Sequence, residues 1–93
     1  MIAYMQINPQ RFSQDLQFCV AEVIFDMRET DERRVLRATL LLRYLPEGYD
    51  MKTYVPTGGD QGLNMLVWDI DARGWRAFPI DRVVSCQMLP GYN

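Results

Sequence analysis

Arginine and aromatic side chains stand out among the residues that could do chemistry, and histidine is absent. Of the ten basic residues only Lys52 is a lysine, and the chain holds two Trp, five Tyr and four Phe. The absence of histidine removes Ser–His and Cys–His nucleophile pairs, histidine general bases and the common zinc and iron ligand sets. We therefore expect a protein that is not an enzyme and that carries no cofactor.

Two other groups of residues have the types needed for metal or phosphate binding. Asp69 and Asp71 lie two apart near a strand end, with Asp81 further on, but their spacing does not match a calcium loop. Aspartates beside turns commonly accept hydrogen bonds from backbone N–H groups. We therefore interpret Asp71 as turn-forming, Asp81 as the cap of a short turn and Asp69 as solvated, and predict no metal site. The glycine-rich residues 57–62 lack the Lys-Ser/Thr that completes a P-loop, which favours a plain loop.

The arginines and rings are the candidate binding residues. Guanidinium groups bind carboxylates and phosphates bidentately, and exposed Trp and Tyr beside Arg are typical of protein-interface hot spots. The candidate partner-binding residues are Trp75, Arg76, Arg37, Arg82, Tyr49 and Tyr54. Three interpretations stay open, namely a surface of arginines paired with the chain's own acids, a protein interface, and a nucleic-acid interface. The last would need a basic groove formed by Arg33, Arg34, Arg37, Arg76 and Arg82.

Overall charge and composition narrow the classes of partner. The net charge of −2 weighs against nucleic acid, because phosphate binding depends on local positive charge. A content of 48% hydrophobic and 24% charged residues is typical of a soluble globular protein. Residues 1–18 lack the pattern of a signal peptide, and no apolar run is long enough to span a membrane. We expect a cytoplasmic protein with no membrane partner.

The elements that would position these residues follow from local patterns. Asn8 as N-cap and Pro9 at the first helical position predict a short helix over residues 9–17. Alternation of apolar and polar residues predicts five strands, over residues 19–27, 33–40, 63–70, 75–80 and 84–89. Asp71 and Gly74 in a short turn indicate a hairpin between the third and fourth strands.

Residues 46–62 are rich in proline and glycine and predict a long loop, with a strand over residues 51–55 as the alternative. Phe25, Trp68 and Phe78 are expected in the core.

One helix and five short strands define the predicted fold class. It is mainly β (α+β), a small five-stranded SH3-like barrel with a short N-terminal helix, since so few strands cannot form two covered sheets. The predicted division is an N-terminal segment over residues 1–18, the barrel over 19–89 and a tail over 90–93. The fourth and fifth strands could offer an edge for pairing between copies, so a homo-oligomer is possible.

The C-terminal third also carries a family resemblance. The residues involved are Val67-Trp68-Asp69-Ile70-Asp71, Gly74-Trp75-Arg76-Ala77-Phe78 and Ile80-Asp81. They resemble the closing hairpin of small phage-encoded SH3-like β-barrel proteins. Residues 36–40 and 45–47 resemble that family's second strand and the proline after it. Residues 75–83 are more loosely similar to the WYL domain, a ligand- or nucleic-acid-sensing module of bacterial regulators.

The resemblance implies a phage origin rather than a mechanism. Taken with the arginine and aromatic surface and the lack of a catalytic constellation, it leads us to expect a non-enzymatic binding module, a phage accessory protein in the host cytoplasm that binds a host protein and inhibits or redirects it. A nucleic-acid-binding barrel and a WYL-like sensor of a small ligand such as a nucleotide are the alternatives. Pro79 departs from the family, which usually has Lys or Arg there. Because first and last strands pair in such barrels, Cys19 and Cys86 are expected on neighbouring strands, as free thiols.

Overall fold

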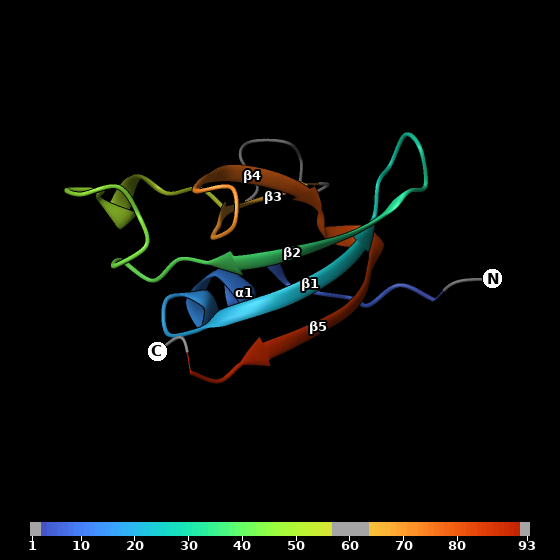
Figure 1. The fold of residues 1–93 in the computed structure, drawn as a ribbon, viewed down its shortest axis with the longest axis horizontal. Coiled ribbons are helices and arrows are strands. Elements are labelled where there is room, and N and C mark those ends of the chain that lie inside the picture. The colour runs from blue at the N-terminus through green and yellow to red at the C-terminus, as the bar shows by residue number, and fades with distance from the viewer. Residues whose placement is uncertain (1–2, 57–63, 92–93) are drawn as a thin grey trace.

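The computed structural model describes residues 3–56 and 64–91, with one α-helix and five strands in the order that the sequence predicts. The elements in chain order are α1 (Pro9–Leu16), β1 (Val20–Asp26), β2 (Arg33–Thr39), the 3₁₀ turn η1 (Met51–Thr53), β3 (Asn64–Asp69), β4 (Gly74–Pro79), the 3₁₀ turn η2 (Ile80–Arg82) and β5 (Val83–Leu89) (Figure 1). The mainly-β fold class with a short N-terminal helix is confirmed.

Local chemistry starts the helix where the sequence predicts. The Asn8 side chain accepts a hydrogen bond from the Arg11 backbone N–H at 3.1 Å, and Pro9 occupies the first turn, where no N–H is needed. Phe12 and Leu16 lie four residues apart on one helical face, and both are buried. The helix therefore contributes an apolar stripe to the core.

The five strands form one antiparallel sheet in the order β4-β3-β2-β1-β5. β1 lies between β2 and β5 and pairs with both. Its ladder with β2 runs from the pair of Val20 and Thr39 to the pair of Asp26 and Arg33. Cys86 of β5 lies opposite Val23 of β1. The expected pairing of first and last strands is confirmed, and both cysteines are free thiols.

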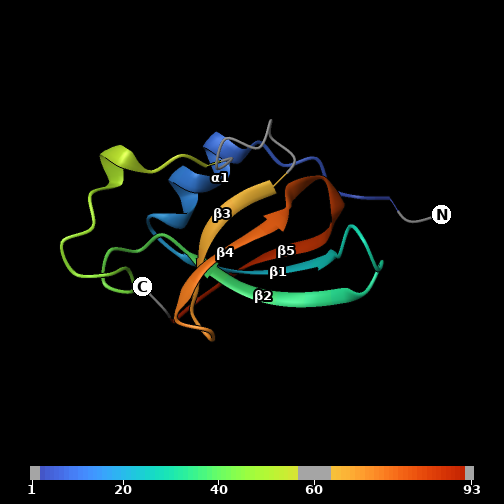
Figure 2. The same cartoon turned by 90° about the horizontal axis from the view of Figure 1, so that it is seen from above.

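The predicted closure into a barrel is wrong, because the sheet is open. β3 joins β2 through only two residue pairs, Ala38 with Asp69 and Thr39 with Trp68, at the C-terminal ends of both strands. The β3–β4 hairpin therefore runs obliquely across β1 and β2 instead of extending their ladder, as Figure 2 shows. β4 and β5 remain the two edges of the sheet.

The hydrophobic core lies between the β3–β4 hairpin and the sheet of β2, β1 and β5, with α1 contributing to it. Its members come from every strand and from α1: Phe12, Leu16, Ala21, Val23, Phe25, Leu36, Ala38, Leu40, Met65, Val67, Phe78, Ile80 and Val83. Phe25 of β1 meets Phe78 of β4 with ring centroids 5.7 Å apart, which links the two layers. Trp68 was expected in the core too, but it is half-buried, because it lies on the other face of β3 from Met65 and Val67.

Residues 49–56, which precede β3 in the chain, dock on the β3–β4 hairpin. The alternative strand over residues 51–55 is wrong, because Asp50 caps the 3₁₀ turn η1 by accepting from the Lys52 N–H at 2.9 Å. Further on, the Leu66 N–H of β3 donates to the Pro56 carbonyl at 2.8 Å. The loop glycines 58, 59 and 62 lie outside the described residues. No helix within residues 3–56 and 64–91 is long and apolar enough to cross a membrane.

Candidate functional site

Four rings from three parts of the chain meet around Trp75 of β4. Trp75 lies opposite Trp68 of β3 in the ladder, and the two rings meet edge to face with centroids 5.5 Å apart. Tyr49 and Tyr54, from the segment that precedes β3, lie 5.1 and 6.2 Å from the Trp75 ring. We call these four residues the aromatic cluster. The structure thus brings together three candidate residues from the sequence, Trp75, Tyr49 and Tyr54.

Two rings of the aromatic cluster have a structural role. Tyr54 and Trp75 are partly buried and pack against the core. The Tyr54 hydroxyl donates to the Leu66 carbonyl, and burial raises the pKa of this phenol well above its usual range. Trp68 and Tyr49 are half-buried on the outer side of this arrangement. Tyr54 and Trp75 therefore support the surface, while Trp68 and Tyr49 remain partly open to solvent.

A pocket of about 360 Å³ adjoins the aromatic cluster and shares Trp68 with it. Its other lining residues are Arg43 and Tyr44 from the segment after β2, and Ile70 and Arg73 from the end of β3 and the hairpin turn. The Arg43 guanidinium lies over the Tyr44 ring, 5.2 Å from its centroid. We call this hollow the arginine–aromatic pocket. Its volume falls within the range of small-ligand sites.

Both arginines of this pocket are exposed and have no ion pair with a carboxylate among the described residues. Six other arginines do have such a partner. Sequence reasoning did not select Arg43 or Arg73. The signal it could have used is the pattern Arg43-Tyr44 after a strand, together with an arginine in the turn just before Trp75.

The three candidate arginines each contact an acid of the same chain. Arg76 lies 3.0 Å from Asp69, and the Arg37 Nε donates to Asp71 at 3.0 Å. Arg82 pairs with Asp31. These pairs correspond to the first interpretation of the arginines, as groups neutralised by the chain's own carboxylates.

The five arginines proposed for a basic groove divide between separate places. Arg37 and Arg76 pair with acids at the β3–β4 turn, whereas Arg33, Arg34 and Arg82 pair with acids in or beside the turn between β1 and β2. Each positive charge among these five is therefore opposed by a nearby negative charge.

The three aspartates considered for a metal site have other partners. The expectation of a solvated Asp69 is wrong, because Asp69 is buried and its carboxylate accepts from the backbone N–H groups of Asp71 and Ala72 at 2.9 and 3.1 Å, which stabilises the hairpin turn. Hydrogen bonds from Arg37 and Arg28 lower the pKa of Asp71 and Asp81, respectively. Within the described parts of the chain no three acidic, Cys or His side chains are grouped to hold a metal ion.

The opposite end of the molecule holds an ion-pair network around the buried carboxylate of Asp26, whose partner Arg33 is half exposed. Asp26 is 3% exposed, and its carboxylate accepts from Arg33 Nε and from the Tyr4 hydroxyl, both at 2.9 Å. Arg82 lies over the Tyr4 ring at 5.4 Å and donates to the Asp26 carbonyl at 3.2 Å. The hydrogen bond from Arg33 is the main reason that the pKa of Asp26 is lowered. This network fastens the N-terminal segment to β1 and η2.

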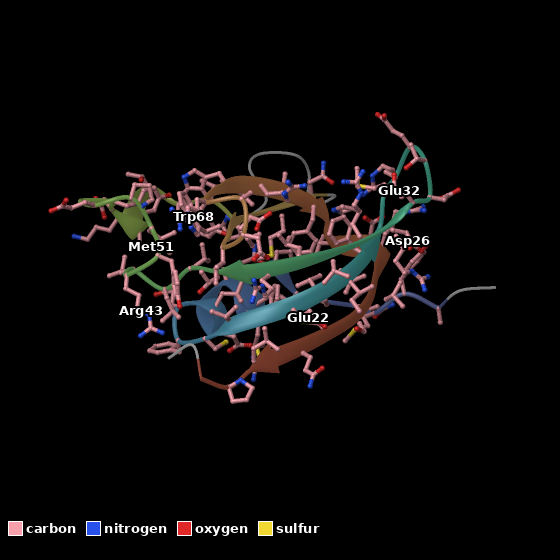
Figure 3. All side chains as sticks on the ribbon, in the orientation of Figure 1. Glu22, Asp26, Glu32, Arg43, Met51 and Trp68 are labelled. Carbon is pink, nitrogen blue, oxygen red and sulfur yellow. The ribbon has the colours of Figure 1, made fainter. Side chains whose placement is uncertain are left out.

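Figure 3 shows the separation of the two regions. Arg43, Met51 and Trp68 lie toward one end of the molecule, and Asp26 and Glu32 lie toward the other. Arg82, which contacts Asp26, is therefore remote from the aromatic cluster.

Comparisons of the chain with known protein families, with curated proteins and with solved structures find no match.

Proposed function

We propose that this protein is a non-enzymatic binding module that engages a partner protein through the aromatic cluster and the adjoining arginine–aromatic pocket. The observation that carries the proposal is Trp68, a half-buried ring shared by both features. Tryptophan, tyrosine and arginine are the residue types in which interface binding energy concentrates. Here all three types meet on one surface, supported by rings that pack on the core.

Charge favours a protein over a nucleic acid as the partner. A nucleic-acid backbone is bound by a row of cations that displace its counterions. In this chain six arginines already face carboxylates of their own, and the net charge is −2. Arg43 and Arg73, which have no carboxylate partner in the part of the chain that the structure describes, suit a local contact with one anionic group better than an extended polyanion.

The finer identity of the partner rests on the sequence resemblance alone. On that basis we propose a phage accessory protein that acts in the host cytoplasm, where it binds a host protein and inhibits or redirects it. Because fold and resemblance do not fix function, the binding surface and the identity of the partner need separate tests.

The test is affinity capture from bacterial lysate with the wild-type protein and two matched variants. Trp68→Ala removes the shared ring, and Phe18→Ala removes a ring that is 75% exposed outside the site. We expect proteins captured by the wild type to be kept by Phe18→Ala and lost by Trp68→Ala, with both variants folded by circular dichroism. Equal capture by both variants would reject the surface. Nuclease-sensitive capture would favour nucleic acid instead.

A further inference from the structure

The arginine–aromatic pocket has an unbalanced charge that its lining does not satisfy. Arg43 and Arg73 enter it from two separate segments, and neither contacts a carboxylate among residues 3–56 and 64–91. The nearest acid in sequence to Arg73 is Asp71, which Arg37 already holds. The remaining lining is Tyr44, Trp68 and Ile70, which carry no formal charge. The pocket therefore presents two cations beside an apolar and aromatic surface.

The arrangement of Arg43 defines what the pocket can accept. A guanidinium over a ring is held by cation–π attraction, and its N–H groups point outward in the guanidinium plane. Those donors match the two oxygens of a carboxylate, which binds arginine bidentately. Arg73 adds a second cation from the hairpin turn, so one carboxylate could contact both arginines.

We infer that the arginine–aromatic pocket binds an acidic side chain of the partner protein, flanked in the partner's sequence by an apolar or aromatic residue that packs on Trp68 and Ile70. The inference rests on the proposed function and specifies its ligand chemistry. Charge complementarity selects the occupant, because the pocket lining holds two arginines and no acid, while the rest of the chain is net negative. A hollow of about 360 Å³ holds one or two side chains.

The experiment is selection of a random dodecapeptide display library on the wild-type protein, followed by titration of a selected peptide. We expect the enriched peptides to carry Asp or Glu next to Phe, Tyr, Trp or Leu. Arg43→Gln and Arg73→Gln should each weaken binding of the synthetic peptide about tenfold. The control is Arg11→Gln, an exposed arginine of α1 that also lacks an ion pair among the described residues, and it should leave affinity unchanged.

A mutant cycle ties the effect to the carboxylate. Replacing the peptide's acidic residue by its amide should weaken binding less in Arg43→Gln than in the wild type, because only the contact with Arg73 is left to lose, and it should cost nothing further in the double variant Arg43→Gln/Arg73→Gln. Enriched peptides without acidic residues, or affinities indifferent to Arg43→Gln and Arg73→Gln, would overturn the inference. If such peptides still lose binding in Trp68→Ala, the proposed function survives. An oligonucleotide that displaces the peptide at lower concentration would overturn it in favour of phosphate.

Discussion

Arginine lies over a tyrosine ring at both ends of the molecule, but only one of the two arginines pairs with a carboxylate of the described residues. Arg82 lies over Tyr4, and it also pairs with Asp31 and donates to the Asp26 carbonyl. Arg43 lies over Tyr44 with no carboxylate partner among the described residues. The same pair of residue types is therefore part of an ion-pair network in one place and part of the lining of the arginine–aromatic pocket in the other.

The difference shows why residue type alone is a poor guide to a binding surface. At the Asp26 end, Arg33 and the Tyr4 hydroxyl donate to the Asp26 carboxylate and Arg82 donates to its carbonyl. Few hydrogen-bonding groups there remain for a partner. At the Trp68 end the rings pack against one another, whereas Arg43 and Arg73 have no carboxylate partner among the described residues. What separates the two ends is the presence of a nearby acid, which depends on the fold rather than on local sequence.

The largest effect is expected from Trp75→Ala. Trp75 contacts three other rings and packs against the core, so its removal leaves a cavity and frees the segment that carries Tyr49 and Tyr54. We expect the free energy of unfolding in urea to fall by about 3 kcal/mol. Sequence analysis selected Trp75 as a candidate partner-binding residue. An unchanged unfolding midpoint would show that Trp75 does not support the fold and is an open surface residue.

The second effect tests the Asp26 end through pH. Because the pKa of Asp26 is lowered in the folded state, its ionised form stabilises the fold above the ordinary aspartate pKa of about 4. That stabilisation is lost as pH falls through the folded-state value. We expect Asp26→Asn to be less stable than the wild type at pH 7 and to lose less stability on acidification.

Urea unfolding midpoints measured between neutral and acidic pH check this. Some pH dependence should remain, because the pKa values of Asp71 and Asp81 are lowered too. The control is Asp15→Asn, an exposed carboxylate of α1 with no ion pair among the described residues. An Asp26→Asn curve parallel to that of the wild type would show that the network at this end does not stabilise the fold.

The third prediction compares the two ends directly. Arg82→Gln removes the Asp31 pair and a bond to the Asp26 carbonyl, and we expect it to cost about 1 kcal/mol of unfolding free energy. Arg73→Gln breaks no ion pair between described residues, so its stability should stay within about 0.5 kcal/mol of the wild type. Peptide binding should change in the reverse order. Equal stability losses in the two variants would remove the distinction between the ends.

Much of the fold could be predicted because its determinants are local. Asn8-Pro9 marks the start of α1, and alternating residues such as Ala21, Val23 and Phe25 mark the strand faces. Closure of the sheet could not be predicted, since it depends on how far β2 and β3 stay paired. β2 and β3 pair only through Ala38 and Thr39, and no local sequence pattern predicts that the ladder is so short.

The candidate site was predicted in part, and for a related reason. Aromatic residues near the long loop and on β4 indicated a surface, and the structure brings Tyr49, Tyr54 and Trp75 together. Which arginines have acidic partners depends on contacts between residues far apart in sequence, such as Arg37 with Asp71 and Arg82 with Asp31. Sequence reasoning therefore selected paired arginines and passed over Arg43 and Arg73.

The smallest effect on stability is expected from backbone strain in the β1–β2 turn and the β3–β4 turn. Asp31 and Arg73 are the non-glycine residues with positive φ among those described, at 57° and 54°. Aspartate tolerates this left-handed region, whereas arginine gains nothing from it and glycine adopts it freely. Arg73 thus occupies a position where glycine would fit the backbone better.

We expect Arg73→Gly to raise the unfolding free energy by about 0.5 kcal/mol, because relief of the left-handed strain slightly exceeds the added entropy of the unfolded chain. The same change should abolish the contribution of Arg73 to peptide binding. Asp31→Gly relieves less strain and removes the partner of Arg82, so it should not stabilise the protein. Urea unfolding of both variants measures the two stability changes, and a peptide titration of Arg73→Gly measures its binding. Stabilisation without loss of binding would mean that the arginine in this turn serves neither the fold nor the pocket.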